Sequence, residues 1–393
     1  MTIVDKEKCC ACRACVQICP QRAISTFNDK FGFERVRVDE GICVDCGLCK
    51  SVCPILNPRK AQGRIKCGSA YSKDKDIKYN GSSGGLFGVF AKKVIEEGGI
   101  VYGAAFDSNL QLKTTRAQNE EQLKQLYKSK YLLCDTSNTF QQIKNELDSG
   151  KKIMYCSSPC QLSALKNYLK KEYTGLLCVE FVCHGVGGQK QFDNSISYIE
   201  RKKKIKIRNF GFREKFDKAS SRYYYYYYYE DLRTGKIKHF RDIYMTFPYY
   251  FAYEERLTCR ESCYECIYAT EDRVGDITIG DFHSISKYEP SIDRFAGVSM
   301  FVCNTELGQK FFDTIRNDIV VKEYDWETIR SNNRFLGKEE MSKKREYYLN
   351  LLADDQYDCS VKKCLAYKKD WRFYYYHLPK WIRNIGNKLL RKN

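Results

Sequence analysis

Apolar and polar positions follow the periods of helices and strands from about residue 66 onward. Three apolar runs predict buried strands, at 100–106, 152–156 and 176–182. Two segments predict helices, at 86–97 and at 162–170. The first helix is preceded by Ser82-Ser83-Gly84-Gly85 and ends at Gly98-Gly99, as helices commonly do. Helices and strands in this alternating order are typical of an α/β fold.

Cysteine dominates the first sixty residues, which contain nine of the 21 cysteines of the chain. Two runs share the pattern C-x-x-C-x-x-C-x-x-x-C-P, and the offsets 43−9, 46−12, 49−15 and 53−19 all equal 34. The pattern is therefore an internal duplication. The first run contains Cys9, Cys12, Cys15 and Cys19 before Pro20, and the second contains Cys43, Cys46, Cys49 and Cys53 before Pro54.

This spacing is that of bacterial ferredoxins with two [4Fe–4S] clusters. Three thiolates two residues apart can bind three corners of one cluster, whereas the fourth cysteine leads away and reaches the cluster of the other run. The predicted ligand sets are Cys9, Cys12, Cys15 with Cys53, and Cys43, Cys46, Cys49 with Cys19. Zinc ribbons, the alternative, use two C-x-x-C pairs instead. Cys10 lies outside the pattern and is expected to be a spectator, and 27–33 predicts a hairpin turn.

Composition narrows the setting of the protein. Hydrophobic residues make up 43% and charged residues 30%, which is typical of a soluble globular protein. We see no window of ~20 apolar residues and no secretory signal, so we expect a cytoplasmic protein. In that reducing environment, dense cysteine indicates metal ligation rather than disulfides. The net charge of +18 suits nucleic acid, an anionic membrane or an acidic partner and does not choose between them.

Four cysteines of the body form a second candidate metal site. Cys160 and Cys183 each follow a predicted strand, and strand ends in an α/β fold meet at one edge of the sheet. Cys263 and Cys266 form a C-x-x-C pair. From spacing alone, a metal site and a set of scattered buried thiols are both open.

At these residues the body resembles the beta-subunit family of hydrogenases and dehydrogenases that use a deazaflavin, coenzyme F-420. The matching stretches run in family order from about residue 66 to 300. They are Ser82-Ser83-Gly84-Gly85, Lys128-Ser129-Lys130-Tyr131, Ser158-Pro159-Cys160-Gln161, Val182-Cys183-His184-Gly185, Phe212-Arg213-Glu214-Lys215, Cys263-Tyr264-Glu265-Cys266 and Gly275-Asp276-Ile277-Thr278-Ile279-Gly280-Asp281-Phe282. Some family members also carry an N-terminal two-cluster ferredoxin domain.

The resemblance implies a bound FAD and a third [4Fe–4S] cluster. The cluster ligands would be Cys160, Cys183, Cys263 and Cys266, with Cys259 as a possible replacement. The residues near the flavin would be Ser82, Ser83, Gly84, Gly85, Lys130 and Tyr131. Electrons would pass between a hydride donor or acceptor, the flavin and the clusters. His184 and His283 are weak candidates for catalysis, because each is more readily explained as structural.

The resulting expectation is an α+β ferredoxin-like head joined to an α/β flavin-binding body. The expected domains are 1–58 for the head, 63–335 for the body (parts 66–150 and 151–335) and 336–393 for a basic aromatic tail. The tail can lie on an anionic membrane or dock on the body or a partner. The tyrosines at 223–229 predict a two-sided strand, with a nucleic-acid stacking platform as the alternative.

Three functions follow as hypotheses. The first is a flavin-dependent iron–sulfur oxidoreductase whose substrate is unknown, with a redox protein or a small hydride carrier as partner. Relatives near genes for surface polysaccharide synthesis suggest a sugar-linked role. The second is a flavin-free electron carrier that docks a catalytic partner. The third, a nucleic-acid-binding protein with structural clusters, is disfavoured.

Overall fold

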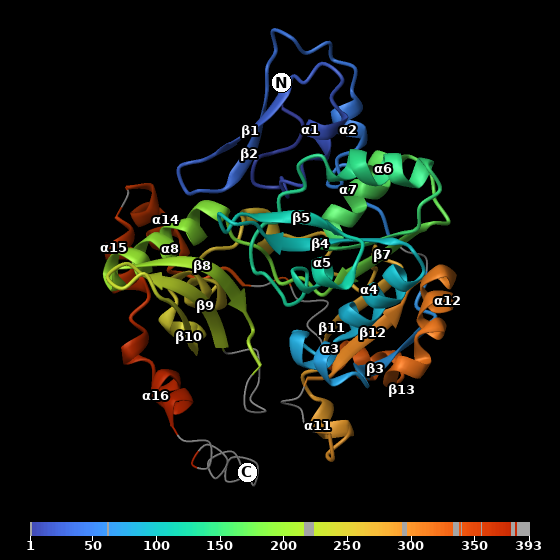
Figure 1. Cartoon of the computed structure of the whole chain (residues 1–393). Coiled ribbons are helices and arrows are strands. Elements are labelled where there is room, and N and C mark those ends of the chain that lie inside the picture. The colour runs from blue at the N-terminus through green and yellow to red at the C-terminus, as the bar shows by residue number, and fades with distance from the viewer. Residues whose placement is uncertain are drawn as a thin grey trace.

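The computed structural model describes residues 2–60, 63–215, 224–292, 297–332, 338, 340–354, 356–378 and 382. The head lies above the body in Figure 1. Its elements are α1 (Ala14–Ile18), β1 (Ile24–Asn28), β2 (Glu34–Val38) and α2 (Leu48–Ser51). The strands pair antiparallel with Asn28 opposite Glu34, which confirms the predicted hairpin.

The duplication of the head is visible in its backbone. Ala11 and Arg13 have positive φ angles of 51° and 58°, just before α1. Asp45 and Gly47, 34 positions further on, have φ angles of 48° and 73°, just before α2. Left-handed residues at these equivalent positions turn the chain sharply in both runs.

A mixed sheet of eight strands forms the centre of the body, in the order β13-β3-β12-β11-β7-β6-β4-β5. The four middle neighbours β11, β7, β6 and β4 are parallel, and antiparallel strands extend both edges. The predicted strands correspond to β4, β6 and β7. The bounds are β3 (Lys66–Ser72), β4 (Ile100–Phe106), β5 (Leu112–Ala117), β6 (Ile153–Ser157), β7 (Leu176–Phe181), β11 (Ile277–Asp281), β12 (Ser299–Cys303) and β13 (Ile319–Glu323).

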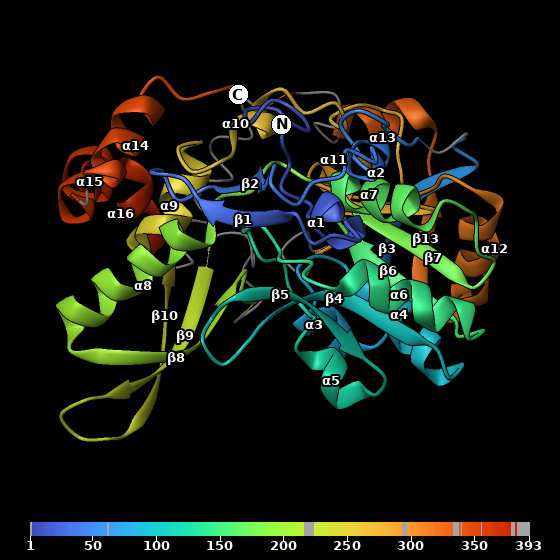
Figure 2. The ribbon, with the colours of Figure 1, turned by 90° about the horizontal axis from the view of Figure 1, so that it is seen from above.

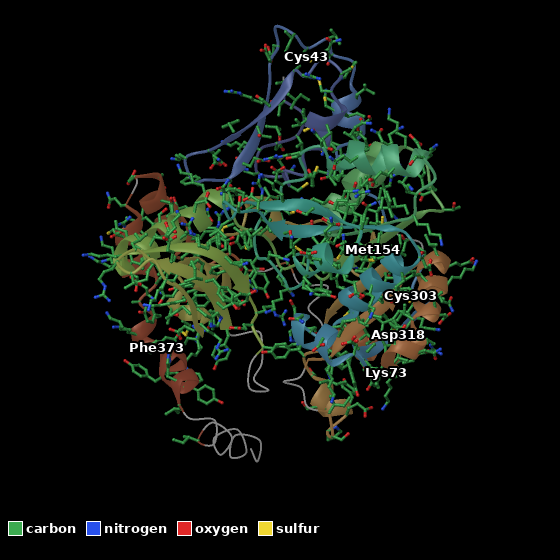
Figure 3. The ribbon with its side chains drawn as sticks, viewed as in Figure 1. Cys43, Lys73, Met154, Cys303, Asp318 and Phe373 are labelled. Atoms are coloured by element: carbon green, nitrogen blue, oxygen red, sulfur yellow. The ribbon has the colours of Figure 1, made fainter. Side chains whose placement is uncertain are left out.

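Helices cover both faces of this sheet, because its strands bury apolar residues on each side. Met154, labelled in Figure 3, packs with α4 and α12, while its neighbours Ile153 and Tyr155 pack with α6 and α7. The helices of this part are α3 (Lys75–Asn80), α4 (Leu86–Glu96), α5 (Glu120–Lys124), α6 (Thr139–Asp148), α7 (Pro159–Leu169), α11 (Ile285–Tyr288), α12 (Glu306–Thr314) and α13 (Trp326–Asn332). The predicted helices correspond to α4 and α7.

The head shares the apolar core of the α6 and α7 layer. Cys12, Ala14 and Val52 of the head are buried in one cluster with residues of both helices, including Phe140 and Leu162. Figures 1 and 2 show the head resting on this side of the body. The head is therefore packed against the body by the same apolar contacts that hold a domain core together.

A smaller antiparallel sheet, β10-β9-β8, lies beside the large one. The tyrosine run forms β9 from Tyr224 on, whereas Tyr223 lies outside the described residues. Tyr225 and Tyr227 are buried against Phe210 and Phe240, and Tyr228 is 44% exposed, so the strand is two-sided as predicted. The elements are α8 (Gln189–Lys203), β8 (Ile205–Phe212), β9 (Tyr224–Asp231), β10 (Ile237–Ile243), α9 (Pro248–Glu254) and α10 (Glu261–Tyr264).

The described part of the tail docks on the body. It contains α14 (Arg345–Ala353), α15 (Tyr357–Cys364) and α16 (Trp371–His377). Arg372 of α16 pairs with Glu255 at 2.8 Å, and His377 lies 3.3 Å from Asp242. Trp371 is nevertheless 71% exposed. Within the described residues, no helix combines the length and apolarity needed to cross a bilayer.

Candidate functional site

Cysteines of both runs meet in the head. A small cavity is lined by Cys19 from the first run together with Cys43, Cys46 and Cys49 from the second. Figure 3 shows Cys43 at the tip of the head, on the side away from the body. The structure therefore brings together the four residues of one predicted crossed set.

The other crossed set lies deeper, toward the body. Burial raises the pKa of Cys15, and the neighbouring Cys9 and Cys53 thiols contribute because thiolates repel one another, so that this pKa is about 12. Cys12 and Cys53 are both buried. Cys53 comes from the second run, so its position beside Cys9 and Cys15 is the crossing that the spacing predicts.

The four cysteines of the body also converge. Cys160 is the second residue of α7, which follows β6, and Cys183 follows the adjacent parallel strand β7. Burial raises the pKa of Cys183, and Cys263 and Cys160 add to the effect. Cys266 interacts with Cys160 and Cys263 in the same way. All four line one cavity of about 1000 Å³.

Cys259 has a different environment from these four. It is 1% exposed, and its sulfur lies against Gly185 in the aromatic core around α9. Cys259 is not among the described residues that line the cavity of about 1000 Å³. Among the described residues, no three His, Cys, Asp or Glu side chains surround a single-ion position. In a [4Fe–4S] cluster each thiolate binds a separate iron.

The same cavity is lined by most residues that the resemblance placed near a flavin. Ser82, Ser83, Gly85, Lys130 and Tyr131 are in its wall, and so are His184 and His283. Gly84 lies behind the wall, since its N–H donates to the Ser299 hydroxyl at 2.9 Å. A Cβ at Gly84 would lie 2.5 Å from the Ala70 carbonyl oxygen, so glycine is required for this close approach.

The serine hydroxyls of this loop already have partners within the protein. Ser82 Oγ accepts from the Ser129 N–H at 2.6 Å, and Ser83 Oγ donates to the Val298 carbonyl at 2.8 Å. These hydrogen bonds hold the loop in place and occupy both hydroxyls. The first amides of α4 have no partner within the helix, so an anion in the cavity can accept hydrogen bonds from them.

Two lysines flank this loop, of which Lys215 is buried and Lys130 is half-buried. Burial lowers the pKa of Lys130 to about 7, although its ammonium donates to the Tyr127 carbonyl at 2.6 Å. Burial and the nearby positive charges of Arg213 and Lys78 lower the pKa of Lys215 to about 7, while Lys215 bonds to the Ser83 carbonyl. A bound anion would stabilise the charged form of either lysine.

The cavity wall also contains an ion pair, Arg213 with Asp281, that we did not single out from the sequence. Arg213 and Asp281 line the cavity and lie 2.8 Å apart. Burial alone would raise the pKa of Asp281, but the Arg213 guanidinium outweighs it and keeps that pKa below its usual range. Both residues fall in matching stretches of the resemblance, so the signal was present. Cys10, expected to be a spectator, also lines this cavity.

Comparison with known proteins identifies both parts of the chain. Residues 150–328 match the family model that describes the C-terminal part of the beta subunit in coenzyme F420 hydrogenase/dehydrogenase, and residues 8–56 match a 4Fe-4S dicluster domain. The chain belongs to the coenzyme F420 hydrogenase/dehydrogenase beta-subunit family. Its head is a 4Fe-4S ferredoxin-like domain, so this family member is an iron–sulfur protein.

Two relatives support this assignment. The coenzyme F420-dependent sulfite reductase of Methanocaldococcus jannaschii is 29% identical over 172 residues, which are 42% of this chain and 26% of that protein. The chain thus spans about a quarter of the length of that relative. A ferredoxin named 7Fe from Hydrogenibacillus schlegelii is 33% identical over 57 residues, 14% of this chain and 67% of that protein.

A solved structure also matches. It is the xenon-derivatized F420-reducing [NiFe] hydrogenase complex from Methanosarcina barkeri, with a TM-score of 0.42 and 17% identity. The match covers 77% of this chain and 91% of the other.

Proposed function

We propose that this family member is an iron–sulfur flavoprotein oxidoreductase that exchanges electrons between a hydride donor or acceptor and its clusters. One observation carries the proposal. A single cavity of about 1000 Å³ contains in its wall both the four body cysteines and the Ser82 and Lys130 segments. This volume is at the upper end of the range for small-molecule sites, roughly 300–1000 Å³.

The thiol sets fit three [4Fe–4S] clusters, because each set supplies four cysteines. We assign Cys9, Cys12, Cys15 and Cys53 to the cluster nearer the body, and Cys19, Cys43, Cys46 and Cys49 to the outer one. We assign Cys160, Cys183, Cys263 and Cys266 to a third. The meeting of these four thiols in the wall of one cavity supports this assignment. Bound iron would stabilise the thiolates that burial alone disfavours.

The remaining wall of the cavity fits FAD. The amides at the start of α4 and the lysine side chains suit an anionic pyrophosphate. The Tyr131 ring is stacked on Tyr253 with 4.8 Å between ring centres, which gives the cavity a rigid aromatic edge. We therefore propose that the Ser82–Gly85 loop, Lys130 and Tyr131 bind the flavin.

When bound, FAD supplies two-electron hydride chemistry and the clusters supply one-electron transfer. The residues of the chain orient and insulate these groups. Arg213 holds Asp281 ionised in the wall, so that edge of the cavity keeps a fixed pair of charges. Lys130 can hold or release a proton at Nζ near neutral pH, because its pKa is about 7.

A flavin-free electron carrier is the second candidate. Two observations favour it: the Ser82 and Ser83 hydroxyls are engaged within the protein, and Gly84 lies behind the cavity wall. In that case the cavity would serve only the third cluster, and the body would dock a catalytic partner.

An anaerobic absorbance spectrum with iron and flavin analysis of one sample tests the proposal. About twelve irons and one FAD per chain are expected, as three Cys₄ clusters require. About eight irons with no flavin would overturn it and leave the head as the redox-active part. A third cluster without flavin would support the second candidate.

Other predictions from the sequence stay predictions. These are the domain limits, the use of a deazaflavin, a redox partner, a role in surface polysaccharide metabolism, a cytoplasmic location and contact of the tail with a membrane. The relative named a coenzyme F420-dependent sulfite reductase supports testing a reduced deazaflavin first, by following bleaching of the flavin absorbance.

A further inference from the structure

Arg260 lies where the head meets the body, and its side chain is fully buried. Its backbone is fixed within the body: the N–H donates to the Val186 carbonyl at 3.1 Å, and the carbonyl accepts from the Cys263 N–H at 3.1 Å. Its side chain reaches the head, where Nη2 donates to the carbonyl oxygens of Cys9 at 3.1 Å and Glu34 at 2.8 Å. The guanidinium therefore contacts the backbone of Cys9, an assigned ligand of the head cluster nearer the body.

Two nitrogens of this guanidinium have no hydrogen-bond partner among the described residues. They are Nε and Nη1, and both are buried. The carboxylates of Glu34 and of the adjacent Glu261 pair with other arginines. A buried cation is costly unless an anion compensates it, and buried N–H groups are almost always bonded. The environment of Arg260 therefore favours an anionic partner beside it.

One aromatic ring compensates this charge only in part. The guanidinium carbon of Arg260 lies 5.7 Å from the centre of the Phe33 ring, and those of Arg35 and Arg345 each lie 5.6 Å from it. Three cations therefore share one ring. Arg35 and Arg345 also share the Glu261 carboxylate, at 2.9 Å and 3.4 Å. The hydrogen bonds described for the Arg260 side chain end instead on neutral carbonyl oxygens.

An iron–sulfur cluster at Cys9 has the charge that suits this cation. The four thiolates outweigh the positive charge of the iron–sulfur core, and reduction adds one further negative charge. A fixed cation beside a ligand stabilises the reduced form more than the oxidised form, so it raises the reduction potential. Burial strengthens this effect, because water does not screen the charge of Arg260.

We propose that Arg260 is the electrostatic partner of the head cluster nearer the body and raises the reduction potential of that cluster. The inference goes beyond the proposed function, since it needs the head clusters but neither a flavin nor the body cluster. The outer head cluster provides an internal reference, because Cys43, one of its assigned ligands, lies at the tip of the head on the side away from the body.

An EPR-monitored redox titration of the full chain with dithionite, with iron analysis of each sample, tests this inference. Arg260→Gln keeps an N–H donor but removes the charge, whereas Arg260→Lys keeps both. We expect Arg260→Gln to lower the reduced-to-oxidised ratio of one cluster at a fixed potential by about tenfold, which is about 59 mV for a one-electron couple. Arg260→Lys should keep the wild-type midpoint.

Arg345→Gln is the matched control. Arg345 is also buried and also donates to a carbonyl, that of Cys259 at 2.8 Å, but it pairs with a carboxylate. This variant should therefore shift the midpoints less than Arg260→Gln does. The midpoint that falls in Arg260→Gln should be the one absent from a double variant that carries Cys9→Ala and Cys53→Ala.

The outcomes separate an effect of charge from a purely structural role. Lower stability with unchanged midpoints in Arg260→Gln would mean that Arg260 only holds the head on the body, and would overturn the inference. Equal shifts in Arg260→Gln and Arg260→Lys, or loss of the cluster in both, would overturn it as well. Loss of the cluster in Arg260→Gln alone would support the need for the charge. The expected shift in a chain without flavin would overturn only the proposed function.

Discussion

The phenol oxygen of Tyr268 in the body lies 2.6 Å from the carbonyl oxygen of Pro54 in the head. Pro54 directly follows Cys53, which we assign as a ligand of the head cluster nearer the body. The same hydroxyl bonds to the Ser163 hydroxyl at 2.8 Å, and Tyr268 is 5% exposed. One buried side chain of the body therefore fixes the backbone beside a ligand of the head.

Replacement of Tyr268 by phenylalanine should loosen this junction. The change leaves the buried Pro54 carbonyl without this donor, which costs about 1–3 kcal/mol. The measurement is the free energy of unfolding from urea titrations. Tyr374→Phe is the control, since that hydroxyl donates to the Lys368 carbonyl at 3.0 Å but its side chain is 59% exposed. Equal losses in the two variants would contradict a special role for the junction.

Paired cysteine variants should reveal the crossed ligation of the head. Cys9→Ala with Cys53→Ala removes two ligands of one cluster, so about four irons should be lost. Cys9→Ala with Cys19→Ala removes a ligand from each cluster and should destabilise both. Iron analysis and EPR spectra of anaerobic samples distinguish the pairs. The reverse result would mean that each run binds its own cluster.

Two neighbouring cysteines of the body should behave differently. Cys263→Ala removes an assigned ligand, so the third cluster and about four irons should be lost while the head keeps its clusters. Cys259→Ala should keep the iron and lower the free energy of unfolding, because its side chain packs in the aromatic core. Loss of iron from Cys259→Ala alone would place Cys259 among the ligands.

Lys130 should make stability depend on pH. In the folded chain its pKa is about 7, against an ordinary value of 10.5. The unfolded chain therefore binds more protons between these values, so the free energy of unfolding rises with pH across this window. Lys130→Met should reduce the gain between pH 7 and pH 9.5 by about 2–3 kcal/mol. Urea titrations at both pH values measure it.

The exposed Lys310 provides the control for this measurement. Its side chain is 79% exposed, so Lys310→Met should keep the wild-type dependence. Lys215, whose pKa is also lowered, should leave part of the dependence in Lys130→Met. An unchanged dependence in Lys130→Met would show that the half-buried Lys130 ammonium is stabilised by its carbonyl partners.

Local patterns in the sequence predicted much of this protein. The repeated cysteine spacing is a short-range pattern, because each run spans few residues. The positive φ angles at Ala11 and Asp45 occur at equivalent positions of the two runs. The apolar runs predicted β4, β6 and β7. Because β6 and β7 are parallel neighbours, the residues after them, Cys160 and Cys183, had to meet at one edge.

The sequence alone determined the type of head, the class of the body and the residue types of the cluster sites, since each depends on short-range spacing. Only the tertiary structure decided what lies between the sites. Tyr268 bonds to the Pro54 carbonyl, and Arg213 pairs with Asp281, across separations that no local pattern encodes. These contacts follow from docking the head on the α6 and α7 layer and from packing the two sheets side by side, which long-range burial determines.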